Sequence, residues 1–316
     1  MSIALAIHGG AGAVSAERLE ANRGDYEEAL DQALQAGRGI LSAGGNAVDA
    51  VTEAVATLED SPMFNAGKGS VLSRDGGAEM SASIMQGELL LAGAVGAVRR
   101  LRNPIRAARA LLSHRHTAMV GGAAEQWLID TYGLEAEEPD YFIVPGRKSQ
   151  WERLQADQTI SVDHDTQTVG AVARDADGKL AAATSTGGLA NQLPGRLSDS
   201  AVPGSGTWAD ERTIAVSATG DGDVFLRHGF ARRVADLVEL EGVSLDRASH
   251  TALAELAYLG GEGGCIALTH RGAPVMKMSS RGMFRGLLAE DGHGYVSVLR
   301  DEPLHRAGKG LESVRG

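Results

Sequence analysis

The chain has 316 residues, enough for one large domain or two ordinary ones, and 43% of them are apolar while only 4% are aromatic. Its formal net charge of −11 argues against nucleic-acid partners and anionic membrane surfaces, because both would select a basic face. The single cysteine excludes an internal disulfide framework, and without a basic leader or a long apolar run the chain is expected to be soluble and cytoplasmic.

The first half of the chain is predicted to be rich in helices around two strand regions. Residues 2–12 (SIALAIHGGAG) are typical of a buried strand that enters a glycine turn, and residues 79–98 are typical of strands as well. Helical periodicity breaks at Gly44-Gly45, after which Asn46 suits an N-cap. Residues 135–164 are polar and weakly periodic, so we expect them to be the least ordered part. The predicted helices of this half span residues 26–58 in two pieces, 104–113, 122–132 and, more briefly, 149–155.

The second half is predicted to alternate short strands with glycine and aspartate turns. Strands are expected in TVGAVARD, LAAATSTGG, TIAVSATGD and GCIALTH, and helices near residues 228–241 and 244–259. Cys265, in the last of these strands, is expected to be a small buried hydrophobe rather than a reactive thiol. This composition suits a layered α/β or α+β architecture in which helices cover a central sheet.

Several familiar motifs of enzymes are missing. The turn HGGAGAV follows a strand, but Ser15 occupies the third glycine position of a dinucleotide-binding G-x-G-x-x-G. Neither a Walker A sequence nor the G-x-S-x-G of nucleophile-elbow hydrolases occurs. His114 and His116 have the spacing of a metal-ligand pair, but no Cys, Asp or Glu cluster joins them in sequence, so we do not expect a metal site there.

Three threonines stand at predicted strand ends beside glycines: Thr168 in QTVGAV, Thr186 in TSTGG and Thr219 in SATGDG. Because threonine favours strands and turn starts, chance is one explanation of this pattern. The chemical explanation is that a threonine hydroxyl becomes a nucleophile when a base, such as its own free α-amine, lies beside it. A cut after Gln167 would give Thr168 that amine, whose reference pKa of about 7.7–8.0 leaves a useful fraction neutral near pH 7. The polar run before Val169 suits such a cut.

Longer motifs occur in one order along nearly the whole chain. They are IHGGAG (Ile7–Gly12), GGNAVDAV (Gly44–Val51), FNAGKGSVL (Phe64–Leu72), EMSASIM (Glu79–Met85), TVGAVARD (Thr168–Asp175), ATSTGGLANQLPGRLSDS (Ala183–Ser200), SATGDGDVFLRHGFARRV (Ser217–Val234) and GGEGGCIAL (Gly260–Leu268). Together they resemble the plant-type asparaginase/isoaspartyl peptidase family of N-terminal nucleophile hydrolases. The resemblance implies an α+β fold, a four-layer αββα sandwich, in one domain of residues 1–316. It also implies self-cleavage into an alpha subunit (1–167) and a beta subunit (168–316), and a homodimer of such pairs.

The resemblance assigns a role to each of the three threonines. Thr168 would be the nucleophile, with its new α-amine as the base, and Thr186 would hold its hydroxyl close to Thr168. Thr219 and Gly220 would form the oxyanion hole through the threonine hydroxyl and the glycine N–H. Donors of this type contribute roughly 3–4 kcal/mol each when they face the developing charge.

The resemblance also implies how the substrate is held. Arg196 would bind an α-carboxylate through its planar fork and Asp199 an α-ammonium group, with a backbone contact from Gly222. Asn65 resembles the residue that orients the nucleophile region. No catalytic metal or organic cofactor is expected, but a structural sodium ion would be held by backbone carbonyls of a loop that includes Leu58, Glu59, Phe64, Ala66 and Lys68.

The implied activity is hydrolysis of the asparagine side-chain amide, of β-aspartyl dipeptides, or of both. Two alternatives remain. One is a glycosylasparaginase-like hydrolase of the same superfamily, which the missing signal peptide and cysteine set disfavour. The other is an uncleaved, inactive homologue that binds aspartate-like ligands.

Three departures from the family pattern bear on these choices. Gln167 replaces the usual glycine before the nucleophile and is expected to slow self-cleavage, because glutamine reaches strained backbone conformations less cheaply. Ser81 stands where EMDA is usual, and Asp221-Gly222-Asp223 replaces the commoner GTGE. Asp221 is expected to add negative charge near the oxyanion site.

Overall fold

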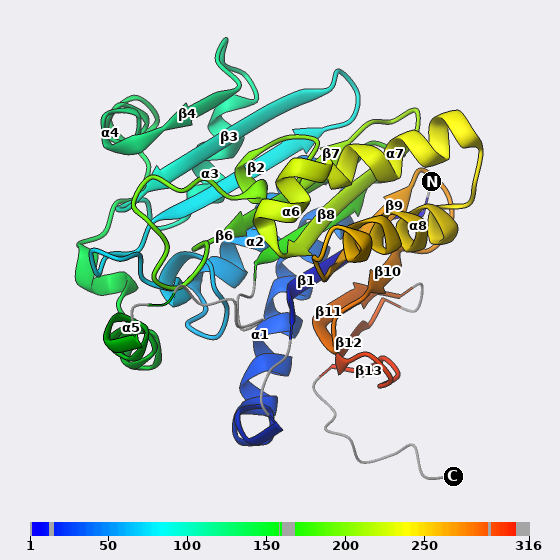
Figure 1. Ribbon diagram of the computed structural model, residues 1–316. Coiled ribbons are helices and arrows are strands. Elements are labelled where there is room, and N and C mark those ends of the chain that lie inside the picture. The colour runs from blue at the N-terminus through cyan, green and yellow to red at the C-terminus, as the bar shows by residue number, and fades with distance from the viewer. Residues whose placement is uncertain (1, 13–15, 158, 160–167, 290–291, 308–316) are drawn as a thin grey trace.

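Two β-sheets form the centre of the protein in the computed structural model, which describes residues 2–12, 16–157, 159, 168–289 and 292–307 (Figure 1). The strands are β1 (Ala4–Gly12), β2 (Met80–Gln86), β3 (Leu91–Val98), β4 (Ala118–Val120), β5 (Val169–Arg174), β6 (Leu180–Thr186), β7 (Thr207–Ala209), β8 (Ile214–Gly220), β9 (Gly263–Thr269), β10 (Val275–Met278), β11 (Gly282–Leu288), β12 (Gly294–Leu299) and β13 (His305–Arg306). The larger sheet has the order β13-β12-β11-β1-β5-β6-β2-β3-β4, and the smaller has the order β10-β9-β8-β7. The neighbouring strands pair antiparallel, except for the parallel pair of β3 and β4.

The order of the large sheet interleaves the two halves of the chain. Strand β1 lies between β11 and β5, and β2 pairs with β6, so strands from before and after residue 168 alternate at the centre of the sheet. Thr168 immediately precedes β5, which places it at the end of a central strand rather than at an edge.

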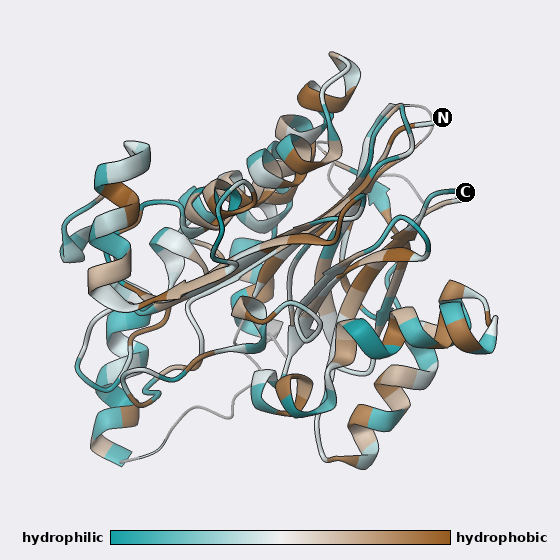
Figure 2. Ribbon diagram, turned by 90° about the horizontal axis from the view of Figure 1, so that it is seen from above, coloured by the Kyte–Doolittle hydropathy of each residue, from teal (hydrophilic) through white to brown (hydrophobic). Residues whose placement is uncertain are grey.

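The helices lie on the outer faces of the two sheets, as Figure 2 shows from above. They are α1 (Ala16–Ser42), α2 (Ala47–Asp60), α3 (Pro104–Leu111), α4 (Gly121–Tyr132), α5 (Pro145–Asp157), α6 (Gly222–His228), α7 (Phe230–Glu241) and α8 (Leu245–Tyr258). Helices α1, α2 and α3 share a core with the large sheet, and α7 and α8 share another with the small sheet. A third core, rich in alanine, lies where the sheets face each other. The prediction of an α+β protein is confirmed, and this packing is consistent with the predicted sandwich.

Most local predictions hold, and the exceptions have physical reasons. Asn46 caps α2, because its side chain accepts the N–H of Asp49 at 2.8 Å. Helix α1 begins about ten residues earlier than predicted, since buried Leu19 and Tyr26 anchor a stretch that carries Gly24.

The expectation that residues 135–164 would be the least ordered part is wrong for residues 145–157. They form helix α5, in which buried Arg147 donates from Nε to the Gly69 carbonyl at 2.9 Å and Trp151 packs against the core of the large sheet. Such a helix has weak apolar periodicity, so the sequence pattern predicted only part of it. Strands β4, β7 and β10 to β13 were not predicted, and β11 carries a buried arginine, Arg285, within an otherwise apolar run.

The expectation for Cys265 is also tested by the described residues. Cys265 is fully buried, and burial raises the pKa of its thiol to about 12. Within the described residues, no three His, Cys, Asp or Glu side chains are grouped to hold a metal ion, and the rings of His114 and His116 lie against each other instead. No helix in the described part of the chain has the length and apolar character to cross a membrane.

Candidate active site

Thr168 and Thr186 lie side by side where β5 begins and β6 ends. The Thr168 hydroxyl donates to the Thr186 hydroxyl at 3.1 Å, and both side chains are buried. Thr186 also accepts the backbone N–H of Gly188 at 3.1 Å, which fixes the position of its oxygen. The antiparallel pairing of β5 with β6 sets this arrangement, because Val169 pairs with Ser185 and brings the flanking threonines to one end of the sheet. The strand register is therefore the physical reason that the hydroxyls of Thr168 and Thr186, which the resemblance placed close together, meet.

Thr219 and Gly220 lie at the end of β8, an inner strand of the small sheet, and Gly220 lines the same pocket as Thr168 and Thr186. The Thr219 hydroxyl accepts the backbone N–H of Ala11 at 3.0 Å, so its proton is not used in that contact. Gly220 has φ +150°, and a Cβ there would come within 2.4 Å of the Glu262 carbonyl oxygen, so only glycine fits. The backbone of Gly220 can thus approach a bound group closely.

Six of the predicted residues line one small pocket. They are Thr168, Thr186, Gly220, Arg196, Asp199 and Gly222, joined by Gly188, Leu189 and Ser198, which the sequence had not singled out. Thr219 is fully buried beside Gly220 and is not itself part of the lining. The pocket therefore combines a hydroxyl nucleophile candidate with one cation and one anion.

The charged end of the pocket is built by Arg196 and Asp199. A Cβ on Gly222 would lie 2.8 Å from both the Arg196 guanidinium and the Asp199 carboxylate, so the glycine leaves the two charges open to each other and to the pocket. Within the described residues, Asp199 Oδ2 and Arg196 Nε are buried without a hydrogen-bond partner. Burial raises the pKa of Asp199 to about 7, although the nearby Arg196 charge opposes the shift. Unused buried donors and acceptors of opposite sign are what an amino acid head group would satisfy.

Residues 1–298 match the model of a family described as Asparaginase. The chain belongs to this family. It is 43% identical over 293 residues to the isoaspartyl peptidase of Salmonella typhimurium, which covers 89% of this chain and 93% of that protein. It is 42% identical over 293 residues to the isoaspartyl peptidase of Escherichia coli, with 89% and 91% coverage. It is 40% identical over 289 residues to a protein of Rattus norvegicus named isoaspartyl peptidase/L-asparaginase, with 90% and 85% coverage.

In this asparaginase-family protein, Asn65 lies outside the pocket lining and holds the Gly187-Gly188 turn that follows Thr186. Its side chain donates to the Gly188 carbonyl at 2.8 Å and accepts the N–H of Val71 at 2.9 Å. The backbone of Gly187 also bonds to the Asn65 carbonyl, and a Cβ on Gly187 would come within 2.4 Å of the Asn65 side chain. Asn65 therefore acts on the pocket through the Gly187-Gly188 turn. Gln167 lies outside the described residues.

Asp221 and Asp223, in the stretch Asp221-Gly222-Asp223 that differs from the family pattern, have different partners. The Asp221 carboxylate accepts the N–H of Glu262 at 2.8 Å and so orders the loop before β9. Asp223, which is 59% exposed, pairs with Arg196 at 3.1 Å. The expectation from the sequence concerned the charge of Asp221 near the oxyanion site, and the carboxylate that pairs with Arg196 is that of Asp223. Ser81, the remaining departure, pairs with Thr186 in the β2–β6 register, which places it next to the threonine pair.

In the loop from Leu58 to Lys68, which is expected to hold sodium, backbone carbonyl groups pack closely against Gly67 and Gly69. A Cβ on Gly67, where φ is +51°, would lie 2.3 Å from the Glu59 carbonyl oxygen, and one on Gly69 would lie 2.0 Å from that of Phe64. Leu58, Phe64 and Ala66 have apolar, buried side chains, so these three residues can offer an ion only their backbone oxygens. Carbonyl oxygens in a compact turn are suitable ligands for a hard cation, so the residues present fit the ion.

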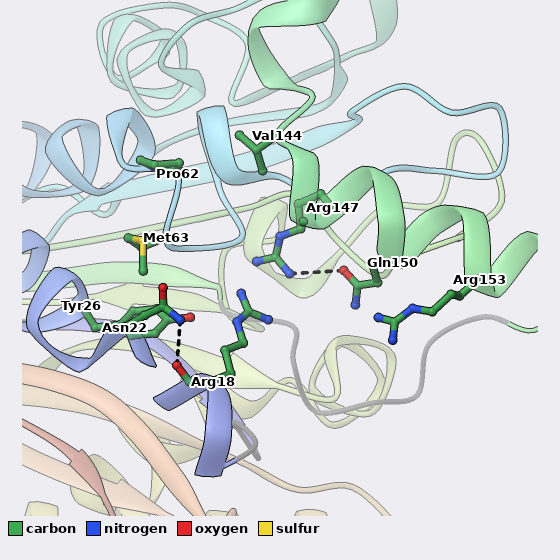
Figure 3. Close-up of a pocket in the computed structure, with 10 residues that line it drawn as sticks. Arg18, Asn22, Tyr26, Pro62, Met63, Val144, Arg147, Gln150 and Arg153 are labelled. Carbon is green, nitrogen blue, oxygen red and sulfur yellow. Dashed lines mark hydrogen bonds between the residues drawn. The ribbon is translucent and has the colours of Figure 1, made fainter. Parts of the chain in front are cut away.

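A second, larger pocket lies between α1, α5 and the loop at Pro62–Met63 (Figure 3). Arg18, Arg147 and Arg153 line it, with the Arg147 guanidinium hydrogen-bonded to Gln150 and to the Gly69 carbonyl. None of the predicted catalytic or substrate-binding residues lines this pocket. Arg147, which lines this pocket, holds the carbonyl of Gly69 in the loop that follows Asn65.

Proposed function

We propose that this chain is a threonine-dependent amidohydrolase that acts on the side-chain amide of asparagine, on β-aspartyl dipeptides, or on both. The names of the relatives support this activity. The observation that carries it is the pocket itself, in which the Thr168 hydroxyl bonds to Thr186 at 3.1 Å while Arg196 and Asp199 line the same space. Both substrates present the same aspartyl head group to that pair of charges.

The proposed maturation gives Thr168 its base. The Thr168 hydroxyl attacks the carbonyl of Gln167, the acyl group moves from nitrogen to oxygen, and water hydrolyses the resulting ester. The products are residues 1–167 with a terminal carboxylate and residues 168–316 with a free α-amine on Thr168. This amine then accepts the hydroxyl proton in catalysis.

In the proposed reaction, Arg196 binds the substrate α-carboxylate and an ionised Asp199 binds the α-ammonium group. Thr168 attacks the side-chain carbonyl, and the negative charge that develops on the oxygen is stabilised by the Thr219 hydroxyl and the Gly220 N–H. Collapse of the tetrahedral intermediate expels ammonia or an amino acid and leaves a β-aspartyl ester on Thr168. Water then releases aspartate and regenerates the hydroxyl.

The same proposal extends to the wider molecule. We assign the two helix-covered sheets to the four-layer αββα sandwich of N-terminal nucleophile hydrolases, matured into subunits of residues 1–167 and 168–316. A homodimer of these subunit pairs, in the cytoplasm, is the proposed working form. A sodium ion held by the carbonyls of the loop from Leu58 to Lys68 would be structural and would take no part in the chemistry.

The proposal is tested by comparing the parent with Thr168→Ala on a denaturing gel and in kinetic assays. Thr213→Ala is the matched control, because Thr213 is a buried threonine in the turn before β8, at the strand end opposite Thr219. We expect cleavage and hydrolysis of asparagine or β-aspartyl dipeptides in the parent and the control, and neither in Thr168→Ala. A Thr168→Ala protein with parental activity would refute the proposal, as would a parent that hydrolyses neither substrate.

A further inference from the structure

A continuous series of buried hydrogen bonds ends on the backbone carbonyl of Thr168. His8 Nδ1 lies 2.9 Å from this oxygen, and His8 Nε2 lies 2.8 Å from the Ser217 hydroxyl. Ser217 contacts the Thr184 hydroxyl at 2.7 Å, and Thr184 contacts that of Thr207 at 2.6 Å. A final contact of 2.9 Å joins Thr207 to Ser83.

Each hydrogen bond in this series is donated toward the Thr168 carbonyl, because that carbonyl can only accept. A carbonyl oxygen can only accept, so His8 Nδ1 must donate to it. Burial lowers the pKa of His8 to about 3, so the ring is neutral and Nε2 accepts the proton of Ser217. Ser217 then accepts from Thr184. The Thr184 hydroxyl also lies 3.1 Å from the Gly206 carbonyl, but its single proton is needed by Ser217.

This hydrogen-bond relay (Ser83, Thr207, Thr184, Ser217 and His8) passes back and forth between the two sheets. Ser83, Thr184 and His8 belong to the large sheet, and Thr207 and Ser217 to the small one. All five side chains are fully buried.

The backbone is shaped to leave room for the relay. A Cβ on Gly170 would lie 2.0 Å from the Ser217 hydroxyl and 2.4 Å from His8 Nε2. The glycine two residues after Thr168 therefore gives the relay the space to reach β1.

Thr168 needs an additional support because it lies just beyond the paired part of its strand. On the β1 side the pairing ends with His8 opposite Gly170, and on the β6 side it ends with Val169 opposite Ser185. The hydrogen bond from the His8 ring to the Thr168 carbonyl fixes the peptide plane between Thr168 and Val169. The hydrogen bond between the Thr168 and Thr186 hydroxyls limits rotation of the Thr168 side chain about its Cα–Cβ bond. After cleavage, no residue precedes Thr168 to hold it from the other side.

We propose that His8 is a positioning residue for the Thr168 nucleophile, and that the relay from Ser83 through Ser217 holds the His8 ring in place. The inference rests on the proposed function, since it concerns the attack by Thr168. The relay does not touch Arg196 or Asp199. Its loss should therefore lower kcat and leave KM unchanged, because misplacing a nucleophile affects the chemical step and not head-group binding.

Two variants separate the two ends of the imidazole. His8→Asn places an amide near the position of Nδ1 and can still donate to the Thr168 carbonyl. His8→Gln places its amide near Nε2, so it keeps the contact with Ser217 and loses the one with Thr168. Ser217→Ala interrupts the relay, and Ser249→Ala is the control, because it removes a buried serine hydroxyl on α8, outside the relay.

The experiment measures kcat and KM per cleaved chain, together with the thermal midpoint. We expect kcat to fall about tenfold or more in His8→Gln, less in Ser217→Ala, and least in His8→Asn, with KM within about twofold of the parent in all three. The control should keep the parental kcat. Parental kcat in His8→Gln would overturn the inference, as would equal losses in His8→Asn and His8→Gln that follow the thermal midpoint. A parent inactive on both substrates would refute the proposed function instead.

Discussion

Replacing Asp199 by a neutral residue should increase the stability of the folded protein and lower its activity. The Asp199 carboxylate is buried, Oδ2 has no hydrogen-bond partner among the described residues, and its pKa is raised from 3.8 to about 7. An acid with a raised pKa binds its proton more tightly in the folded state. The free energy of unfolding therefore decreases as the pH rises above 3.8, because ionising Asp199 is harder in the folded protein. Above about pH 7 the decrease reaches its full size. Asp199→Asn removes this decrease.

The size of the effect follows from the pKa. A shift of about three units at roughly 1.4 kcal/mol per unit gives about 4 kcal/mol above pH 7. Near pH 5 the difference is about 1.5 kcal/mol, and below the unfolded pKa it vanishes. These values are upper limits, because Arg196 loses a neighbouring anion in the variant. The gain in stability of Asp199→Asn over the parent should thus increase with pH.

Urea unfolding at about pH 5 and pH 8 measures this gain, in a Thr168→Ala background that keeps the chain in one piece. The same substitution in the cleavable chain should remove most of the hydrolytic activity, since a neutral amide cannot match a substrate ammonium group. In the cleavable parent, kcat/KM should fall as the pH drops below about 7, where Asp199 becomes protonated. An Asp199→Asn gain that is the same at both pH values, or a loss of stability at pH 8, would refute the reasoning.

Three further substitutions test other parts of the site. Thr219→Val removes the hydroxyl that accepts the Ala11 N–H and should lower kcat by about 10²-fold in a steady-state assay; a change within about twofold would take Thr219 out of the oxyanion hole. Arg196→Lys should raise KM roughly tenfold, because a point charge cannot reproduce the bidentate contact with a carboxylate, and an unaltered KM would place the carboxylate elsewhere. Gly170→Ala introduces a Cβ 2.0 Å from the Ser217 hydroxyl and should destabilise the protein by about 1–3 kcal/mol in thermal unfolding, an expectation that a parental midpoint would contradict.

Local and motif-based features of this protein could be predicted from its sequence, while features that depend on distant pairings could not. The Asn46 cap is a contact between residues three apart, so the sequence pattern was sufficient. The motifs also identified Thr168, Arg196 and Asp199, which line one pocket. The hydrogen bond from His8 to the carbonyl of Thr168 joins residues 160 positions apart and depends on strand register, which no local pattern specifies.

The contacts of charged side chains could be predicted only in part. The sequence drew attention to the DGD stretch but not to which aspartate meets Arg196, because that depends on the turn from β8 into α6. The carboxylate of Asp221 turns to the Glu262 N–H, and that of Asp223 reaches the guanidinium. Helix α5 was predicted only over residues 149–155 because polar contacts such as that of Arg147 leave no apolar stripe to read.

The interleaved strand order of the large sheet determines how the two subunits would stay associated after cleavage and how they would refold. Separating residues 1–167 from residues 168–316 would require breaking the β11–β1, β1–β5 and β6–β2 interfaces at once, so a cut before Thr168 would leave the assembly intact. The peptide bond at that point would be needed only while the sheet assembles, when a continuous chain keeps the two halves at high effective concentration. Once denatured, the cleaved protein would have to refold by a second-order encounter between two chains. Its recovery should then depend on protein concentration, whereas that of the uncleaved Thr168→Ala chain should follow a first-order course.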